Sequence, residues 1–329
     1  MRGPMADPDP EHRSGEGTPL VLVHGITSSW RAWRPVIPLL AGRHDVFAPS
    51  LAGHHQAAPV AADTAWSVLR LTDALEAQLD AAGIGTAHVA GNSLGGWVAL
   101  ELARRGRARS VVALSPAGGW REPKELRRVL RMIRVGRAFA HHPLLAVMLA
   151  RPRVRRAILR GVSERGQRMS PSDARQFFDD ILGCSALDDL LAAIERDGPL
   201  PPLSEPTCRV RIAWGQHDRT IPFARYGHPL AECVPHAELL SMIGVGHVPM
   251  YDDPALVADT ILDLTGQVDV DTRHPVDTRH ARAVGRLRGV LGRVTQAARS
   301  GDRRGDQGIR PGEAARNGAP TQRAGFVDL

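Results

Sequence analysis

Short apolar runs alternate with helical segments along most of this chain, and this alternation constrains the fold more than any other feature. Residues 19–25 (PLVLVHG) and 87–91 (AHVAG) are apolar runs of strand length. Between such runs, as at positions 68, 71, 75 and 79, apolar residues recur at helical spacing. The pattern predicts an α/β fold: a mostly parallel, twisted sheet flanked by helices on both faces. The expected strands are 19–25, 44–49, 87–91, 110–116, 210–215 and 237–242.

The alternation is interrupted once, and both ends of the chain differ in composition from its middle. Residues 117–206 show several helical patterns and no convincing strand, which predicts an inserted helical cap. The core is then 18–116 together with 207–266, the last helix lying at 253–266. Residues 1–17 are rich in proline, glycine and charge, and 267–329 form a basic segment of similar character. Both are expected to be largely disordered tails.

Charge and cysteine content narrow the class of protein. The net charge of +7 is local, because residues 121–168 alone carry 14 Lys and Arg against 3 Asp and Glu. The remaining body is acidic, so a nucleic-acid-binding body is not expected. Three scattered cysteines predict free thiols rather than a disulfide framework. With no secretory signal or membrane-length apolar run, a cytoplasmic location is the expectation.

The stretch HVAGNSLGGWVAL (88–100) places one serine between glycines, directly between an expected strand and an expected helix. Gly91, Asn92, Ser93 and Gly95 fit the pattern G-x-S-x-G, in which a sharp turn raises the serine hydroxyl clear of the sheet edge. A packing turn is the alternative explanation of the glycines alone. The strand-turn-helix context favours Ser93 as a nucleophile.

A serine hydroxyl needs a base to accept its proton and an acid to orient that base. Asp218, in WGQHDRTIP, follows the expected strand 210–215, and His247, in GVGHVPM, follows the strand ending near 242. Either residue alone is commonly a loop residue. Together, in the order serine, aspartate, histidine and each just after a strand, they predict a catalytic triad.

An acyl-transfer intermediate also needs N–H donors for its oxyanion. The N–H of Leu94, at the start of the helix after Ser93, is one candidate, helped by the helix dipole. The second is the N–H of Ile26 in HGITSS, where Gly25 allows close approach of the backbone. His24 is interpreted as a residue that stabilises this loop, because His247 has the better position for a base.

Four segments, LVHGITSSWRAW, GNSLGGW, WGQHDRTIP and GVGHVPMYDDP, resemble the signature blocks of the α/β-hydrolase superfamily, in particular its capped serine esterase and haloperoxidase-like branch. The resemblance covers about 18–266. It implies the same triad and oxyanion hole, and a helical cap over the site. Serine at position 93 disfavours the epoxide hydrolase and haloalkane dehalogenase branches, which use a carboxylate there. Val248, where carbon–carbon bond hydrolases often have Trp, disfavours that branch.

The function expected from these residues is hydrolysis of a carboxylic ester through an acyl-enzyme, with a small-molecule ester or related acyl substrate. No metal or organic cofactor is needed for it. Acyl transfer to peroxide or another acceptor, carbon–carbon bond hydrolysis and a non-catalytic ligand receptor remain as alternatives. Apolar residues at 144–149, including Met148, are expected to line the pocket, whereas Trp97 is expected in the core.

Two basic segments are left to explain. Arginines of the cap could face the site and select an anionic acyl substrate, or could lie on a solvated helix face, which is the commoner arrangement. They are Arg121, Arg127, Arg128, Arg131 and Arg134. In the tail, VDTRHPVDTRH (270–280) is a short duplication, more simply a linker than a metal site. Residues 284–294 follow a helical spacing that could contact an anionic membrane.

Overall fold

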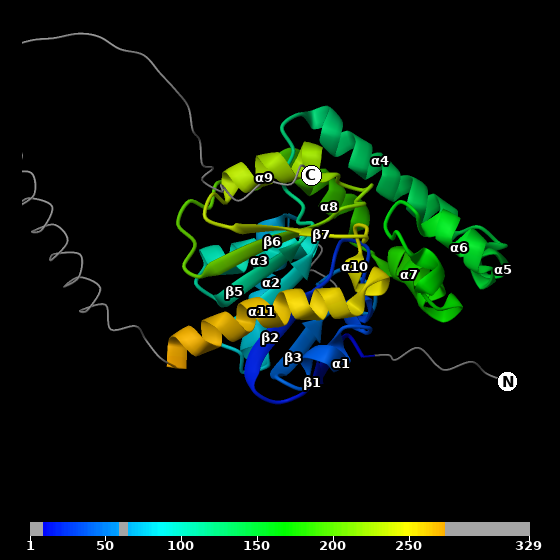
Figure 1. Ribbon diagram of the computed structural model, residues 1–329. Helices are drawn as coiled ribbons and strands as arrows, with labels where there is room; N and C mark the ends of the chain where they lie inside the picture. The colour runs from blue at the N-terminus through cyan, green and yellow to red at the C-terminus, as the bar shows by residue number, and fades with distance from the viewer. Residues whose placement is uncertain (1–8, 59–64, 274–329) are drawn as a thin grey trace, which may run out of the picture. The chain divides into compact units, whose positions relative to one another are not determined.

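The structure, a computed structural model, describes residues 9–58 and 65–273. In this part of the chain seven strands form one sheet (Figure 1). All neighbouring strands are parallel except the pair at the first edge. In spatial order they are β1 (Glu11–Ser14), β3 (His44–Pro49), β2 (Thr18–Val23), β4 (Ala87–Asn92), β5 (Ala108–Leu114), β6 (Arg209–Gly215) and β7 (Glu238–Met242).

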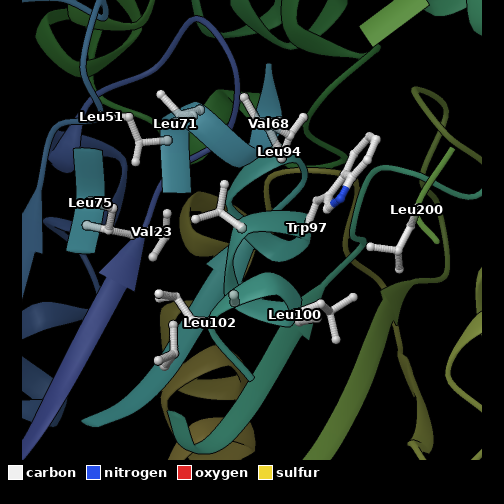
Figure 2. Packing of buried hydrophobic residues seen from close by; sticks show 14 of the residues in the cluster. Val23, Leu51, Val68, Leu71, Leu75, Leu94, Trp97, Leu100, Leu102 and Leu200 are labelled. Atoms are coloured by element: carbon white, nitrogen blue, oxygen red, sulfur yellow. The ribbon is translucent and has the colours of Figure 1, made fainter. Parts of the chain in front are cut away.

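The central strands are buried on both faces, which is why the sequence shows them as continuous apolar runs. Successive residues of β2 point to opposite faces: Val21 and Val23 join one apolar cluster, Leu20 and Leu22 the other. Figure 2 shows part of the first cluster, to which Val23, Leu71 and Leu94 belong. That face is covered by α2 (Val68–Ala81) and α3 (Leu94–Arg104); the other is covered by η1 (Trp30–Trp33), α1 (Ile37–Leu40) and α11 (Pro254–Arg273).

The prediction that residues 1–17 are disordered is wrong for residues 11–14, which form β1. This strand pairs antiparallel with β3, and Arg13 donates two hydrogen bonds to Asp45, at 3.0 and 2.6 Å. An edge strand is held by backbone hydrogen bonds and needs no apolar alternation, so its composition resembles that of a tail. Residues 1–8 lie outside the described part.

The helix indicated by the spacing of positions 68, 71, 75 and 79 begins at Val68, because Ser67 provides the N-cap and accepts a hydrogen bond from the N–H of Arg70. One helix boundary differs from the prediction. The last helix, expected to end at 266, continues to Arg273. The expected tail therefore begins as helix. Its duplicated motif beyond 273 and its basic segment at 284–294 lie outside the described residues.

Between β5 and β6 the described chain forms helices and no strand. We refer to residues 117–206 as the helical insertion. It contains α4 (Pro123–Ala140), α5 (Leu145–Ala150), α6 (Pro152–Leu159), η2 (Gly166–Arg168), α7 (Pro171–Gly183) and α8 (Leu187–Asp197). Residues of α4 to α7 share an apolar cluster of their own, which includes Leu145, Leu149, Leu159, Phe178 and Ile181. The insertion therefore has its own buried core.

After β6, the chain forms the short π-helix η3 (Phe223–Gly227) and α9 (His228–Cys233), and α10 (Pro249–Asp252) follows β7. All three cysteines are free, as their number predicts. Among the described helices, none combines the length and the apolar character needed to cross a bilayer.

Candidate active site

Ser93 lies at the sharp turn between β4 and α3, with φ of +56° and ψ of −117°. A residue with a side chain rarely adopts this conformation, which costs about 1–3 kcal/mol and needs support from its surroundings. The backbone supplies it: the Ser93 N–H donates to the carbonyl of Leu114, and the Ser93 carbonyl accepts from Gly96, Trp97 and Ala117. The turn thus holds the serine hydroxyl at the carboxyl edge of the sheet.

The two glycines of the motif are required by close backbone contacts. A Cβ atom on Gly91 would lie 2.1 Å from the carbonyl oxygen of Gly95. One on Gly95 would lie 2.2 Å from the carbonyl oxygen of Val23 in β2. Both distances are far below van der Waals contact, so α3 could not approach the sheet this closely with larger residues. The same glycines therefore permit the turn and position Ser93.

Asp218 and His247 lie in the loops after β6 and β7, and they are hydrogen-bonded to each other. The Nδ1 atom of His247 is 2.8 Å from Oδ2 of Asp218, and both side chains are buried. The other carboxylate oxygen accepts from the N–H groups of Thr220 and Ile221, at 2.9 and 2.8 Å. With Nδ1 donating to Asp218, Nε2 is the ring nitrogen left to accept a proton. This pairing can activate a hydroxyl group.

Asn92 connects the turn at Ser93 to the histidine loop. Its side-chain amide donates to the carbonyls of Leu114 and His247, at 3.1 and 2.9 Å. The residue before the serine thereby links both reactive loops. The sequence motif includes Asn92, but it does not indicate these two hydrogen-bond acceptors.

Asp252, in α10, is fully buried. It lies in the segment GVGHVPMYDDP, but the sequence alone assigns it no role. It accepts a 2.7 Å hydrogen bond from the N–H of Gly246, next to His247. It also accepts from the insertion: the hydroxyl of Ser163 at 2.5 Å and the N–H groups of Glu164 and Arg165 at 3.0 and 2.7 Å. Those partners are almost ninety positions away in sequence, so no local signal could identify them.

The loop after β2 places Ile26 beside Ser93, and both line the same cavity. Leu94 is the first residue of α3, so its N–H has no acceptor within the helix. His24 precedes this loop: its Nδ1 pairs with the carbonyl of Gly25 at 2.8 Å, and its Nε2 accepts from the N–H of Leu51 at 2.9 Å. Burial lowers the pKa of His24 to about 3, so the ring is neutral near pH 7 and holds the loop.

A cavity of about 730 Å³ lies over Ser93 and His247. Trp97 contributes to its wall as well as to the core. Of the segment 144–149, Met148 lines the cavity as expected, but the other five residues are not among its described lining residues. Apolar side chains of the insertion form most of the remaining wall, including Leu130, Ile133, Phe139, Ile158 and Phe178.

None of the described residues lining this cavity is lysine or arginine. The hypothesis that cationic residues of the insertion face the site is therefore wrong. None of the five arginines named in the hypothesis lines the cavity, and all are exposed: Arg121, Arg127, Arg128, Arg131 and Arg134. Arg121 precedes α4, and the other four lie on the polar side of that helix, because its apolar stripe turns toward the cavity.

Asp180 of α7 is the one acidic residue among the described residues lining the cavity, and the sequence alone assigns it no role either. It accepts hydrogen bonds from the hydroxyl of Ser29, at 2.6 Å, and from the amide of Gln176, at 2.8 Å. Burial raises the pKa of the Asp180 carboxyl. Because Ser29 follows the Ile26 loop, this hydrogen bond joins the insertion to the proposed oxyanion loop.

Comparison with known proteins identifies the family of this chain. A family model described as "Alpha/beta hydrolase family" matches residues 20–260. The chain is 34% identical over 201 residues to the epoxide hydrolase EphH of Mycobacterium tuberculosis, covering 58% of this chain and 91% of that protein. It is 27% identical over 278 residues to a 2-hydroxymuconate semialdehyde hydrolase of a Pseudomonas species, covering 78% of this chain and 90% of that protein.

Among solved structures, an esterase from Thermogutta terrifontis matches with a TM-score of 0.62 at 19% identity, covering 78% of this chain and 93% of that one. At this level of identity the match concerns the fold alone. The residues that the family model matches make up most of the chain. This chain belongs to the alpha/beta hydrolase family.

Proposed function

We propose that this protein hydrolyses carboxylic esters, with Ser93 as nucleophile, His247 as general base and acid, and Asp218 as the residue that orients His247. The observation that carries the proposal is the buried hydrogen bond between His247 and Asp218 at a cavity that Ser93 also lines. A receptor would need neither a strained serine nor a histidine oriented in this way.

The reaction follows from these positions. As the Ser93 hydroxyl attacks the ester carbonyl, Nε2 of His247 takes its proton, and the Asp218 carboxylate stabilises the imidazolium that forms. The N–H groups of Ile26 and Leu94 donate to the tetrahedral oxyanion. The imidazolium then protonates the leaving alcohol, and an acyl group remains on Ser93. His247 next deprotonates a water molecule, which attacks the acyl group and forms a second tetrahedral intermediate. When that intermediate collapses, the bond to Ser93 breaks, the imidazolium returns the proton to the Ser93 oxygen, and the carboxylic acid is released.

The cavity supports an apolar, uncharged substrate. A volume of about 730 Å³ is in the range that holds a drug-sized ligand. A substrate with a free carboxylate would meet the carboxyl of Asp180 and no cationic group among the described lining residues. Transfer of such an anion into an apolar wall without a partner is unfavourable. We therefore propose esters with sizeable apolar acyl or alcohol groups.

The helical insertion acts as the cap of this site in our proposal. Side chains from α4, α5, α6, α7 and α8 all contribute to the cavity wall. Its residues therefore determine which acyl and alcohol groups fit, while the loops of the core provide the chemistry. Asp252 and Asp180 each join the insertion to a loop of the core.

Two relatives are named for other reactions. Opening an epoxide by an ester-forming carboxylate requires an acid at the turn between β4 and α3, where this chain has Ser93. The residue after the histidine is Val248, which lines the cavity, in place of the Trp frequent in carbon–carbon bond hydrolases. Both features support ester hydrolysis over the relatives' reactions.

The test is covalent labelling by a fluorophosphonate, followed by rates on a panel of substrates. We expect labelling of the wild type and none of Ser93→Ala. Hydrolysis of p-nitrophenyl decanoate is expected to exceed that of a succinate half-ester in kcat/KM, and styrene oxide is expected to be unchanged. Equal labelling of both proteins would refute Ser93 as nucleophile. Epoxide turnover that survives in Ser93→Ala would show that another residue carries the reaction.

A further inference from the structure

The outward side of α4 carries a row of cations. Positions 124, 127, 131 and 134 are spaced by three and four residues, so they share one face of the helix. All four side chains, Lys124, Arg127, Arg131 and Arg134, are exposed. The opposite face is apolar and lines the cavity. In Figure 1, α4, α5 and α6 lie on the side of the insertion away from the sheet.

Most of these cations have no acidic partner. Several other arginines of the insertion are paired: Arg121 with Glu232, Arg137 with Asp188 and Arg156 with Glu164. By contrast, Arg128 and six further exposed arginines in or directly beside α4, α5 and α6 have no carboxylate within 4.0 Å in the described chain. We call the six further residues the arginine face: Arg127, Arg131, Arg134, Arg151, Arg153 and Arg160. Five cations of α4 line one surface hollow with Glu195 of α8, which is the one acid among the described lining residues of that hollow. Cations in such excess produce a positive surface.

Exposed apolar side chains lie in the same three helices and the turn between α4 and α5. Val135 is 62% exposed, Leu144 57% and Val147 59%. Val135 is also part of the cavity wall, together with Met148 and the exposed Ala157 of α6. Residues that are exposed and line the cavity mark its mouth. The mouth therefore opens among α4, α5 and α6, next to the arginine face.

We propose that the surface of α4–α6 binds an anionic phospholipid bilayer. The arginine face pairs with lipid phosphates, while Leu144 and Val147 enter the interface between head groups and acyl chains. Anionic head groups are complementary in charge to the arginines. The boundary between head groups and acyl chains removes the exposed apolar side chains from water, which solvates them poorly. Nucleic acid or an acidic protein would match the charge, but a phosphate backbone offers no apolar region for Leu144 and Val147.

Such binding deepens the proposed function, on which its consequence rests. With the cavity mouth at the bilayer surface, an apolar ester dissolved in the membrane reaches Ser93 without crossing water. The substrates would then be esters that partition into lipid. The docking itself does not require catalysis, so the two proposals can fail separately.

The test is sedimentation of the full-length chain with vesicles, carried out in the Ser93→Ala background so that lipid is not consumed. We expect binding to vesicles of equal parts phosphatidylcholine and phosphatidylglycerol, and little to pure phosphatidylcholine. The variant R127Q/R131Q/R134Q removes three charges and is expected to partition about 100-fold more weakly. The variant L144S/V147S is expected to lose the part of binding that persists at about 500 mM salt.

The matched control is R43Q/R70Q/R209Q, which removes the same charge from exposed positions outside the insertion. It is expected to bind almost as the parent protein does. With Ser93 restored, R127Q/R131Q/R134Q should hydrolyse a short soluble ester at the parent rate, which shows that it is folded. Undiminished vesicle binding by that variant, an equal loss in the control, or equally tight binding to duplex DNA would overturn the proposal.

Discussion

Replacing Asp252 by asparagine tests how the histidine loop is held. The carboxylate accepts four hydrogen bonds, two at each oxygen: Ser163 and Arg165 at Oδ1, and Glu164 and Gly246 at Oδ2. Asparagine keeps one oxygen of the same shape and places an NH₂ group at the other position. At Oδ2 the NH₂ group faces the N–H groups of Glu164 and Gly246; at Oδ1 it faces the N–H of Arg165 and a hydroxyl that can turn to accept from it. Each N–H donor left buried without a partner costs about 1–3 kcal/mol, so we expect Asp252→Asn to lower the unfolding free energy by about 1–4 kcal/mol.

The same substitution should slow catalysis more than it weakens substrate binding. Gly246 adjoins His247, and the N–H of Val248 donates to the carbonyl of Val162 in the insertion, at 2.8 Å. When the Gly246 N–H has no carboxylate to bind, the loop that carries His247 is held less firmly. A displacement of about 1 Å at a reacting group costs up to about 100-fold in rate. We expect kcat to fall by about 10- to 100-fold with KM nearly unchanged.

Urea unfolding gives the stability change, and steady-state hydrolysis of a soluble p-nitrophenyl ester gives kcat and KM. The matched control is Asp253→Asn, because Asp253 caps α11 through the N–H of Leu256, and asparagine caps equally well. A stability change below about 0.5 kcal/mol together with an unchanged kcat would refute the reasoning. So would an equal effect of the control.

Three further substitutions test other contacts of the site. Gly95→Ala places a methyl group 2.2 Å from a carbonyl oxygen of β2 and should destabilise the fold by about 3 kcal/mol or more. Its control is Gly266→Ala, where no atom lies within 4 Å of the new methyl group and a slight stabilisation is expected. The midpoints of urea unfolding compare the two variants. For His24, burial lowers the pKa from 6.5 to about 3, so the unfolded state takes up a proton first and stability falls as the pH drops through this window. His24→Gln should therefore make the unfolding free energy less dependent on pH between these values, and an unaltered slope would contradict this account. Asn92→Ala removes the donor to the His247 carbonyl and should lower kcat about 10-fold at constant KM, and a change confined to KM would argue against it.

The central fold was predictable because its signals are local. A parallel strand covered on both faces must be apolar throughout, as in 19–25 and 87–91. The triad candidates were identifiable because Ser93, Asp218 and His247 each follow such a strand, and parallel strands bring their carboxyl ends to one edge.

The rest depends on contacts between distant segments. Asp252 meets residues 163–165, and Asp180 meets Ser29, so neither has a local pattern that distinguishes it from a surface acid. β1 is held by the edge of β3 and by an ion pair rather than by burial of its own side chains. For a similar reason, the sequence left open whether the arginines of the insertion face the cavity or the solvent. Helical spacing places them on one face but does not say what the other face covers.

The hydrogen bonds of Asp252 join the histidine loop to the insertion, and we call them the Asp252 bridge. This bridge has a consequence for how such an enzyme changes during evolution. Three of its four donors are main-chain N–H groups, which every residue except proline provides. The side chains at positions 164 and 165, and the helices before and after them, can therefore vary without loss of the bridge. New substrate preferences can arise in the insertion by mutation, while the histidine loop keeps its alignment for the same chemical step.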